Sequence, residues 1–194
     1  MPKVSRKKGS DARERLLSAA YQLFSAQGVE QVGVDTIVAR SGCAKASLYA
    51  HFPSKSDLAL AFLERREAVW THGWLEAEVH RRGKTPEARL LAIFDVFDGW
   101  FQKPTFEGCS FINVLLETGA RSPVRRAAAQ HLANIRAIVR GLADDARLAD
   151  SGRFADAWHM LMKGCIVAAG EGNRQAARTA KRAAKLVLDG WPRR

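Results

Sequence analysis

The chain has 194 residues, of which 47% are hydrophobic and 26% are charged. This length fits one or two small domains, and the composition is that of a folded globular protein, which excludes a disordered chain. No apolar run approaches the ~20 residues that a membrane-spanning helix needs, and the amphipathic N-terminal segment lacks the apolar core of a signal peptide. We therefore expect a cytoplasmic protein.

The formal net charge of +11 is unevenly distributed along the chain. Residues 1–55 contain nine Lys and Arg against four Asp and Glu, residues 56–172 contain fifteen of each, and residues 173–194 contain seven against one. A basic N-terminal segment on a neutral body is typical of a phosphate-binding module joined to a separate core. The basic C-terminal segment either serves the same purpose or is a solvated helix face, and charge alone leaves both interpretations open.

Helical periodicity dominates the chain, and strand signals are nearly absent. The first helix is predicted over residues 11–27, with Asp11 as its N-cap, Glu14 reaching back in a capping box and Gly28 ending it. A second helix over about 34–40 and a third over about 45–52 follow. The turn between them contains Gly42, which we expect in the left-handed conformation.

Pro53 stops the third helix, and Ser54 caps a long fourth helix that extends to about His80. Five further helices are predicted over about residues 86–101, 109–118, 123–148, 154–169 and 174–188. The expected fold is therefore all-α, with about nine helices. We expect a small three-helix domain over residues 1–54 and a larger helical domain over residues 55–194.

The second and third helices with their turn form a helix-turn-helix. The third helix would be ~12 Å long at 1.5 Å per residue, which is short enough to lie in the major groove of DNA. Its inner positions are predicted to pack against the first helix, and the residues of this core are Leu17, Phe24, Ile37, Val38, Cys43, Leu48 and Phe52. Its outer positions would contact bases and phosphates through Lys45, Ala46, Ser47, Tyr49 and His51, and Lys55 adds a cation at the start of the next helix.

The segment from Ile37 to Leu58 resembles the DNA-binding signature of the TetR/AcrR family of transcriptional repressors. Its most specific part is Leu-Tyr-x-His-Phe-x-x-Lys-x-x-Leu at residues 48–58, and the resemblance covers about residues 11–60. It implies that Lys45, Ala46 and Ser47 face bases, that Tyr49, His51 and Lys55 hold the DNA backbone, and that Thr36 belongs to the same set. The sequence departs from the family at Gly33 and Ala44, where capping residues are usual, and at Cys43, where Val is usual.

The larger domain is rich in aromatic residues, which are either core or, as the resemblance implies, the lining of an effector cavity with a few polar groups. The candidate lining residues are Trp70, Trp74, Phe97, Trp100, Phe101, Cys109, Asn113, Glu117, His131, Trp158 and His159. The segment from Gly108 to Asn113, followed by Glu117, is similar to one in a subgroup of these regulators. Cys109 is either a small buried residue or a sensing thiol.

No catalytic or metal site is predicted. The three cysteines, Cys43, Cys109 and Cys165, lie 66 and 56 residues apart, which argues against a disulfide framework and a zinc site. Cys109 with His131 or His159 imitates a thiol nucleophile and its base, but such pairs arise by chance among scattered residues, and no phosphate loop or paired acidic motif is present. We expect no enzyme and no cofactor.

A homodimer is predicted through helices 154–169 and 174–188, because one recognition helix contacts too few bases for useful specificity. The first of these helices has a broad apolar surface formed by Ala155, Trp158, Leu161, Met162, Cys165, Ile166 and Ala169, and the second is rich in alanine. The alternative is that this surface closes the core of the monomer. The predicted function is a repressor that binds a palindromic operator as a homodimer and is released by a small, largely apolar effector, and the alternative is an effector-independent DNA-binding protein.

Overall fold

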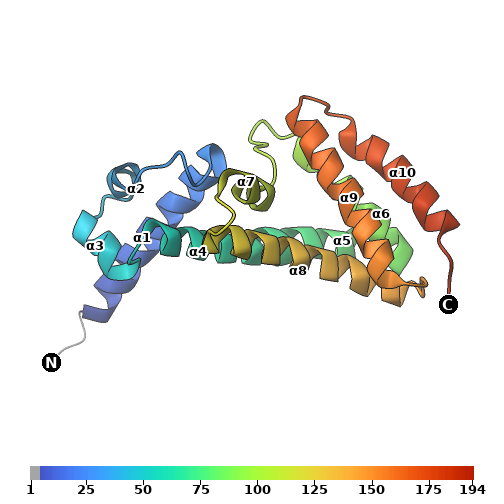
Figure 1. The fold of residues 1–194 in the computed structure, drawn as a ribbon, viewed down its shortest axis with the longest axis horizontal. Helices are drawn as coiled ribbons and strands as arrows, with labels where there is room; N and C mark the ends of the chain where they lie inside the picture. The colour runs from blue at the N-terminus through green and yellow to red at the C-terminus, as the bar shows by residue number, and fades with distance from the viewer. Residues whose placement is uncertain (1–4) are drawn as a thin grey trace. The chain divides into compact units, whose positions relative to one another are not determined.

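A computed structural model of the chain describes residues 5–194, with side chains from Asp11 onward, and these residues form an all-α fold (Figure 1). The elements are α1 (Ser5–Gln27), α2 (Val34–Ser41), α3 (Lys45–His51), α4 (Lys55–Arg66), the π-helix η1 (Glu67–Glu76), α5 (Ala77–Arg82), α6 (Pro86–Phe101), α7 (Ser110–Glu117), α8 (Pro123–Asp145), α9 (Ser151–Gly170) and α10 (Ala176–Gly190). Because α4, η1 and α5 follow one another without a break, the described residues form nine helical rods, as predicted.

The chain divides into two compact units. The first unit contains the described residues up to Glu67 together with Ser110–Gln130, and the second contains Ala68–Cys109 and His131–Arg194. The boundary expected after residue 54 therefore lies inside the first unit. The difference arises because α4 packs on α1 and α7 packs on α4, so both helices share the core of the N-terminal part.

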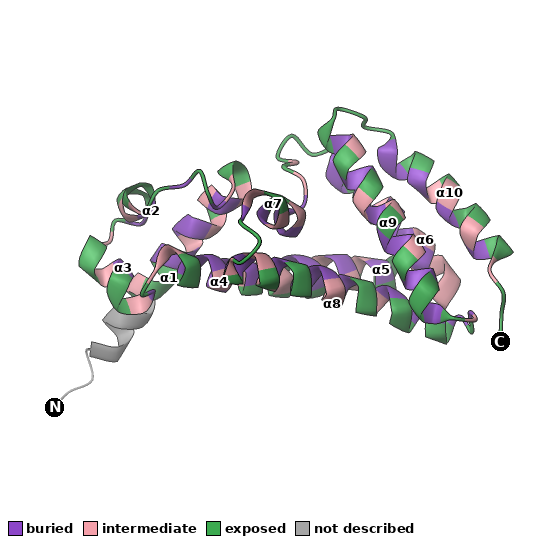
Figure 2. Cartoon of the chain, viewed as in Figure 1, coloured by how far each residue is buried: buried purple, intermediate pink, exposed green. Residues whose placement is uncertain are grey.

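The core of the first unit is built where α1 packs against α2, α3 and α4. Its fully buried side chains include Leu16, Phe24, Ile37, Leu48, Leu58 and Phe62, and Phe24 meets Phe62 edge to face with ring centroids 5.5 Å apart. The predicted inner positions Leu17, Phe24, Ile37, Leu48 and Phe52 are all buried, whereas Val38 and Cys43 are half-buried. Buried, intermediate and exposed residues alternate along the helices (Figure 2). The spacing of the apolar residues thus identified the inner face of the helix-turn-helix.

The predicted start of the first helix is wrong. The helix α1 begins at Ser5, so Asp11 lies inside it and pairs with Arg15 one turn later. Glu14 does not close a capping box, because its carboxylate accepts hydrogen bonds from the Arg65 guanidinium and the Ser18 hydroxyl. The Arg65 hydrogen bond lowers the pKa of Glu14 below its usual value. An ion pair to α4 has replaced the expected local cap.

The long fourth rod begins as predicted, because the Ser54 hydroxyl accepts a hydrogen bond from the Asp57 backbone N–H at 3.2 Å. Its middle departs from the expectation of a uniform α-helix, since residues Glu67–Glu76 are π-helical. A Cβ added at Gly73 would lie 3.0 Å from the carbonyl oxygen of Ala68, five residues earlier, so glycine suits this wider turn. Such π segments are rare and frequently lie at functional sites.

In the second unit, α10 packs along α6 and α9, and α6 also contacts α9 (Figure 1). The cations of the C-terminal segment pair with carboxylates of this unit. Arg178 binds Asp98 at 3.1 Å and Lys181 binds Asp95 at 2.6 Å, both across the α10–α6 contact. Arg193 pairs with Glu87 and Arg194 with Asp144, each at 2.8 Å. Much of the positive charge of the C-terminal segment is therefore paired with carboxylates of the second unit, both on α10 and in the residues that follow it.

Among the described residues, none of the helices combines the length and the apolar character needed to span a bilayer.

Candidate DNA-binding surface and effector pocket

The turn between α2 and α3 has the predicted geometry. Gly42 ends α2 with φ 63° and ψ 25°, a left-handed conformation that glycine adopts at little cost. Gly33 and Ala44 precede α2 and α3 in extended conformations, and neither provides a side-chain cap. The Ser41 hydroxyl instead accepts a hydrogen bond from the Cys43 N–H at 3.3 Å, so the turn is held from within.

The short helix α3 presents a polar outer surface above a buried anchor. Leu48 is fully buried, while Lys45, Ala46 and Tyr49 are exposed, and Tyr49 retains 46% of its accessible surface. Ser47 and His51 are half-buried, and Thr36 is exposed on α2. The structure thus brings the residues predicted for DNA contact into one short stretch, with hydroxyl, imidazole and ammonium groups available for bases and phosphates.

An ion pair that the sequence did not indicate holds the first residue of α3. The Lys45 ammonium lies 2.8 Å from a carboxylate oxygen of Asp35 on α2, and both side chains are largely exposed. The hydrogen bond and the charge of Asp35 raise the pKa of Lys45. The ammonium group that was predicted to face DNA bases is therefore paired with a carboxylate in this structure.

Lys55 is the first residue of α4 and is half-buried. Its ammonium group donates a hydrogen bond to the backbone carbonyl of Glu30 at 3.1 Å. The neighbouring Ser54 hydroxyl caps the Asp57 N–H. A cation placed beside a helix N-terminus, where backbone N–H groups and the helix dipole both favour anions, suits a phosphate contact.

Two polar residues predicted for the effector cavity lie in the first unit, on α7. Asn113 is exposed, whereas the Glu117 carboxylate accepts hydrogen bonds from the backbone N–H groups of Val29 at 2.8 Å and Glu30 at 3.4 Å. These two N–H groups belong to the loop that follows α1. The structure therefore places Glu117 against the loop before α2.

The predicted aromatic residues of the second unit pack mainly on one another. Neighbouring ring centroids lie 4.9–6.3 Å apart in a cluster of Trp70, Trp74, Phe97, Trp100, Phe101 and Phe106. Trp158 belongs to a second cluster, stacked on Phe154 at 5.0 Å and tilted against Phe94 at 5.5 Å. Such ring contacts contribute to stability beyond the area they bury. Most of these rings are buried, as expected for core residues.

The predicted polar candidates Cys109, His131 and His159 are buried in the second unit. Burial, reinforced by the charges of Lys163 and Arg136, lowers the pKa of His159 to about 4. The imidazole is therefore neutral at pH 7. Within the part of the chain that the structure describes, no group of three or more His, Cys, Asp or Glu side chains is arranged to hold a metal ion.

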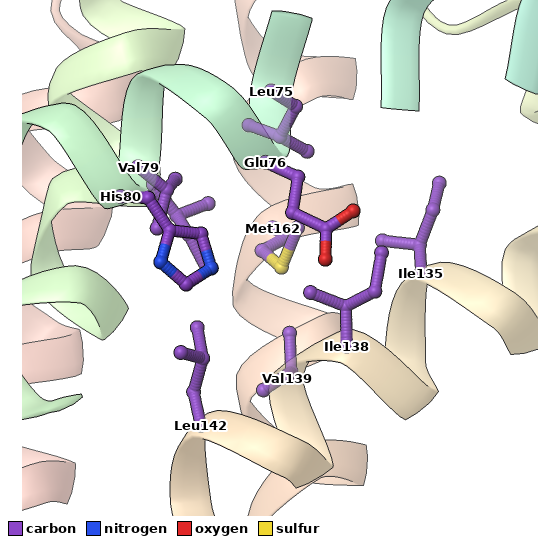
Figure 3. Close-up of a pocket in the computed structure, with 10 residues that line it drawn as sticks. Leu75, Glu76, Val79, His80, Ile135, Ile138, Val139, Leu142 and Met162 are labelled. Carbon is purple, nitrogen blue, oxygen red and sulfur yellow. The ribbon is translucent and has the colours of Figure 1, made fainter. Parts of the chain in front are cut away.

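A different set of side chains lines an apolar pocket in the second unit. These residues are Leu75, Glu76, Val79, His80, Ile93, Ile135, Ile138, Val139, Leu142 and Met162, and none of them belongs to the predicted lining. Side chains from η1 and α5 face those from α8 across it (Figure 3). Its cavity volume of about 20 Å³ accommodates roughly one water molecule, whereas ligand pockets usually measure ~300 Å³ or more. The i, i+3, i+4, i+7 spacing of Ile135, Ile138, Val139 and Leu142 was the only signal in the sequence for this face of α8.

The surface predicted to join two subunits is buried within the monomer. Trp158, Met162, Cys165 and Ile166 are all less than a tenth exposed, because α6 and α10 pack against α9. The exposed apolar side chains of the two C-terminal helices lie on other faces, and they are Met160, Val167 and Leu186. The apolar surface of α9 that supported the predicted dimer is therefore largely part of the monomer core, whereas the argument from DNA specificity is untouched and the homodimer stays a prediction.

Comparison with known proteins finds two family models along the chain. The model described as bacterial regulatory proteins, tetR family, matches residues 16–62, and the model described as Tetracyclin repressor-like, C-terminal domain, matches residues 86–186, which is more than half of the chain. The chain belongs to the TetR family. This confirms the resemblance, the fold class and the expectation of a regulator rather than an enzyme.

Solved structures of other TetR-family members share the fold over almost the whole chain. A TetR-family transcriptional regulator from Streptomyces coelicolor is 28% identical, with a TM-score of 0.81 over 93% of this chain and 95% of that one. A putative TetR regulator from Streptomyces avermitilis is 29% identical, with a TM-score of 0.77 over 90% of this chain and 98% of that one.

Curated relatives match over shorter stretches. The HTH-type transcriptional regulator LmrA of Bacillus subtilis is 49% identical over 61 residues, which are 30% of this chain and 32% of LmrA. An uncharacterized HTH-type transcriptional regulator of Lactococcus lactis is 25% identical over 111 residues, or 57% of this chain and 56% of that protein. The matches thus span about half, or less, of the length of these relatives.

Proposed function

We propose that this TetR-family protein is a repressor that binds a palindromic DNA operator as a homodimer and is released from it by a small, largely apolar effector. The observation that carries the proposal is the outer surface of α3, where exposed Lys45, Ala46 and Tyr49 lie beside the buried anchor Leu48. The cytoplasmic location stays a prediction.

Base reading and backbone binding are assigned to different residues, which makes the DNA-binding step testable. Lys45 and Ala46, at the start of α3, are assigned to base edges, and Lys55 is assigned to a phosphate. Operator sequences are first selected from random DNA with the wild-type protein. Lys45→Ala is then expected to lower affinity and relax base preference, and Lys55→Ala to weaken all sequences about equally and to reduce the salt dependence of binding. Equal affinity of the wild type for selected and random DNA would contradict the proposal.

Dimerisation is assigned to the outward faces of α9 and α10. Met160 is 62% exposed, Val167 is 49% exposed and Leu186 is 75% exposed, although all three are large apolar side chains. Two copies of this helix pair would form a four-helix bundle, and the two α3 helices could then meet half-sites ~34–36 Å apart or a multiple of that distance.

The test of the dimer is sedimentation at micromolar concentration. Met160→Glu is expected to shift the protein toward the monomer, because a charge would be buried at the interface. Leu116→Glu provides a matched control, since Leu116 is 73% exposed but lies on α7. A wild-type protein that sediments as a monomer with and without DNA would refute this part of the proposal.

The effector is assigned to the apolar pocket between the η1–α5 segment and α8. Its walls are almost entirely aliphatic, and Glu76 and His80 are its polar members, so an apolar molecule with a polar end fits the lining. Because the cavity now holds about 20 Å³, binding requires the η1–α5 segment and α8 to move apart. The ligand would then bind the opened state more tightly than the closed state. This difference in affinity is what allows a ligand to release the protein from DNA.

A compound library screened by thermal stabilisation tests the effector. Hits are expected to lower operator affinity, and operator DNA must weaken the same compounds by the same factor. Ile138→Trp, which fills the pocket, is expected to abolish the stabilisation while leaving operator binding in place. If the hits stabilise the protein without changing operator affinity, the effector-independent alternative is correct.

A further inference from the structure

The loop between α1 and α2 donates backbone hydrogen bonds to the carboxylate of Glu117, which lies 88 residues after Val29 in the sequence. Glu117, the last residue of α7, accepts the N–H of Val29 through one oxygen and the N–H of Glu30 through the other. A charged acceptor makes such hydrogen bonds stronger than neutral ones. Both partners lie in the first unit.

The Glu117 carboxylate lies close to the start of the loop. Gly28 has φ +85°, and a Cβ added there would lie 2.5 Å from Oε2 of Glu117, so the carboxylate would have to shift. The left-handed conformation at this position favours glycine. The loop is anchored on its other side, because Val29 and Val32 are buried.

The same loop holds the cation that we assign to a DNA phosphate. Glu30 donates its N–H to Glu117 and accepts the Lys55 ammonium on its carbonyl oxygen at 3.1 Å. Glu117 and Lys55 are thus joined through the backbone groups of one residue. Movement of the Glu117 carboxylate would shift Glu30 and change where the Lys55 ammonium lies.

The other end of this chain of contacts is α8. The Arg125 guanidinium donates hydrogen bonds to the carbonyl oxygens of Leu115 and Thr118, which flank Glu117. The C-terminal end of α7 is therefore clamped to the first turn of α8. Further along the same helix, Ile135, Ile138, Val139 and Leu142 line the apolar pocket.

We propose that Glu117 is a positioning residue that couples α8 to the phosphate-binding Lys55 through the loop of residues 28–30. The inference rests on the proposed function and names the contacts through which a displacement of α8 would reach the DNA-binding surface. In it, a displacement of α8 moves Arg125 and the end of α7, the carboxylate leaves Val29 and Glu30, and Lys55 is deprived of its backbone support. Lys55 then no longer lies where it binds phosphate.

The test uses the full chain and Glu117→Gln, which keeps the size of the side chain but removes its charge and one acceptor. The matched control is Glu64→Gln, because Glu64 is an exposed residue on α4 in the same unit. Removing a negative charge from a DNA-binding unit by itself strengthens DNA binding, so Glu64→Gln should leave operator affinity unchanged or slightly increased. Glu117→Gln should instead weaken it by about 2- to 30-fold. The slope of log K against log salt should also become shallower, by about one for each phosphate that the protein no longer neutralises.

Two further arms separate positioning from a general loss of structure. In a Lys55→Ala background, Glu117→Gln should cause no additional loss of affinity, because its effect passes through Lys55. Hydrogen exchange without DNA should show faster exchange at Val29 and Glu30 in Glu117→Gln while the amides of α2 and α3 stay protected. Unchanged exchange, or an equal loss of affinity in the Lys55→Ala background, would overturn the inference. A wild-type protein that selects no DNA sequence would instead remove the proposed function, and the exchange arm would still decide whether Glu117 holds the loop.

Discussion

The neutral, buried His159 predicts a loss of stability in mild acid. His159 is 4% exposed on α9, and burial together with the charges of Lys163 and Arg136 lowers its pKa to about 4. In the unfolded chain the pKa of histidine is ~6.5. Between these values the unfolded state binds a proton that the folded state does not bind. The free energy of unfolding therefore falls as the pH is lowered through this range. Above pH ~7 the titration of His159 no longer changes it.

The size of the effect follows from the two pKa values. At pH 5 the unfolded state is favoured by RT ln(1 + 10^1.5), which is about 2 kcal/mol, while the folded-state correction is negligible. The carboxylates of Glu14, Glu87 and Asp144, whose pKa values are lowered by their partners, lose their contributions only near and below their ordinary pKa of ~4. The window from pH 7.5 to pH 5 thus separates histidine titration from that of these carboxylates, and the comparison with a His159 variant isolates His159.

The assay is denaturant unfolding followed by tryptophan fluorescence at pH 7.5, 6 and 5, at one fixed protein concentration because any oligomer would make stability concentration-dependent. Between pH 7.5 and pH 5, the free energy of unfolding of His159→Gln is expected to fall by about 2 kcal/mol less than that of the wild type. His80→Gln is the control, since His80 is exposed on α5. If His159→Gln and the wild type lose the same amount of stability over this range, the reasoning from burial is refuted.

Three other substitutions test the DNA surface and the backbone. Asp35→Asn should tighten operator binding a few-fold at low salt, because Lys45 no longer has to leave its carboxylate, and anisotropy measurements in a Lys45→Ala background should show a smaller gain, which comes only from the loss of the negative charge. Gly141→Ala should raise the free energy of unfolding by about 0.5–1 kcal/mol, because Gly141 lies inside α8 and a Cβ there meets nothing within 4 Å. Gly42→Ala should lower it by about 1 kcal/mol, because φ is +63° at that position. The reverse signs at the two glycines in thermal or denaturant unfolding would contradict the backbone argument.

The sequence by itself determined the helix-turn-helix and the family. The signals for it are local, since Gly42, the buried positions Ile37, Leu48 and Phe52, and the Ser54 cap all lie within about twenty residues of one another. Conformational preferences and helical periodicity act over such distances. The bounds of α6 were predicted correctly for the same reason, because Pro86 starts the helix behind a Thr85 cap.

Only the tertiary structure shows which helix covers each apolar helix face and which charged side chains pair with one another. Periodicity shows that α9 has an apolar face, but only packing shows that α6 and α10 cover it, leaving Met160 and Val167 outside. The pairing of the α10 cations with Asp95 and Asp98 spans about eighty residues of sequence, and the grip of Val29 and Glu30 on Glu117 spans a similar distance. Side chains that meet across such separations leave no regular spacing in the sequence, because nothing local links them. The apolar pocket beside α8 and the contacts of Glu117 therefore became visible only when the helices were placed against one another.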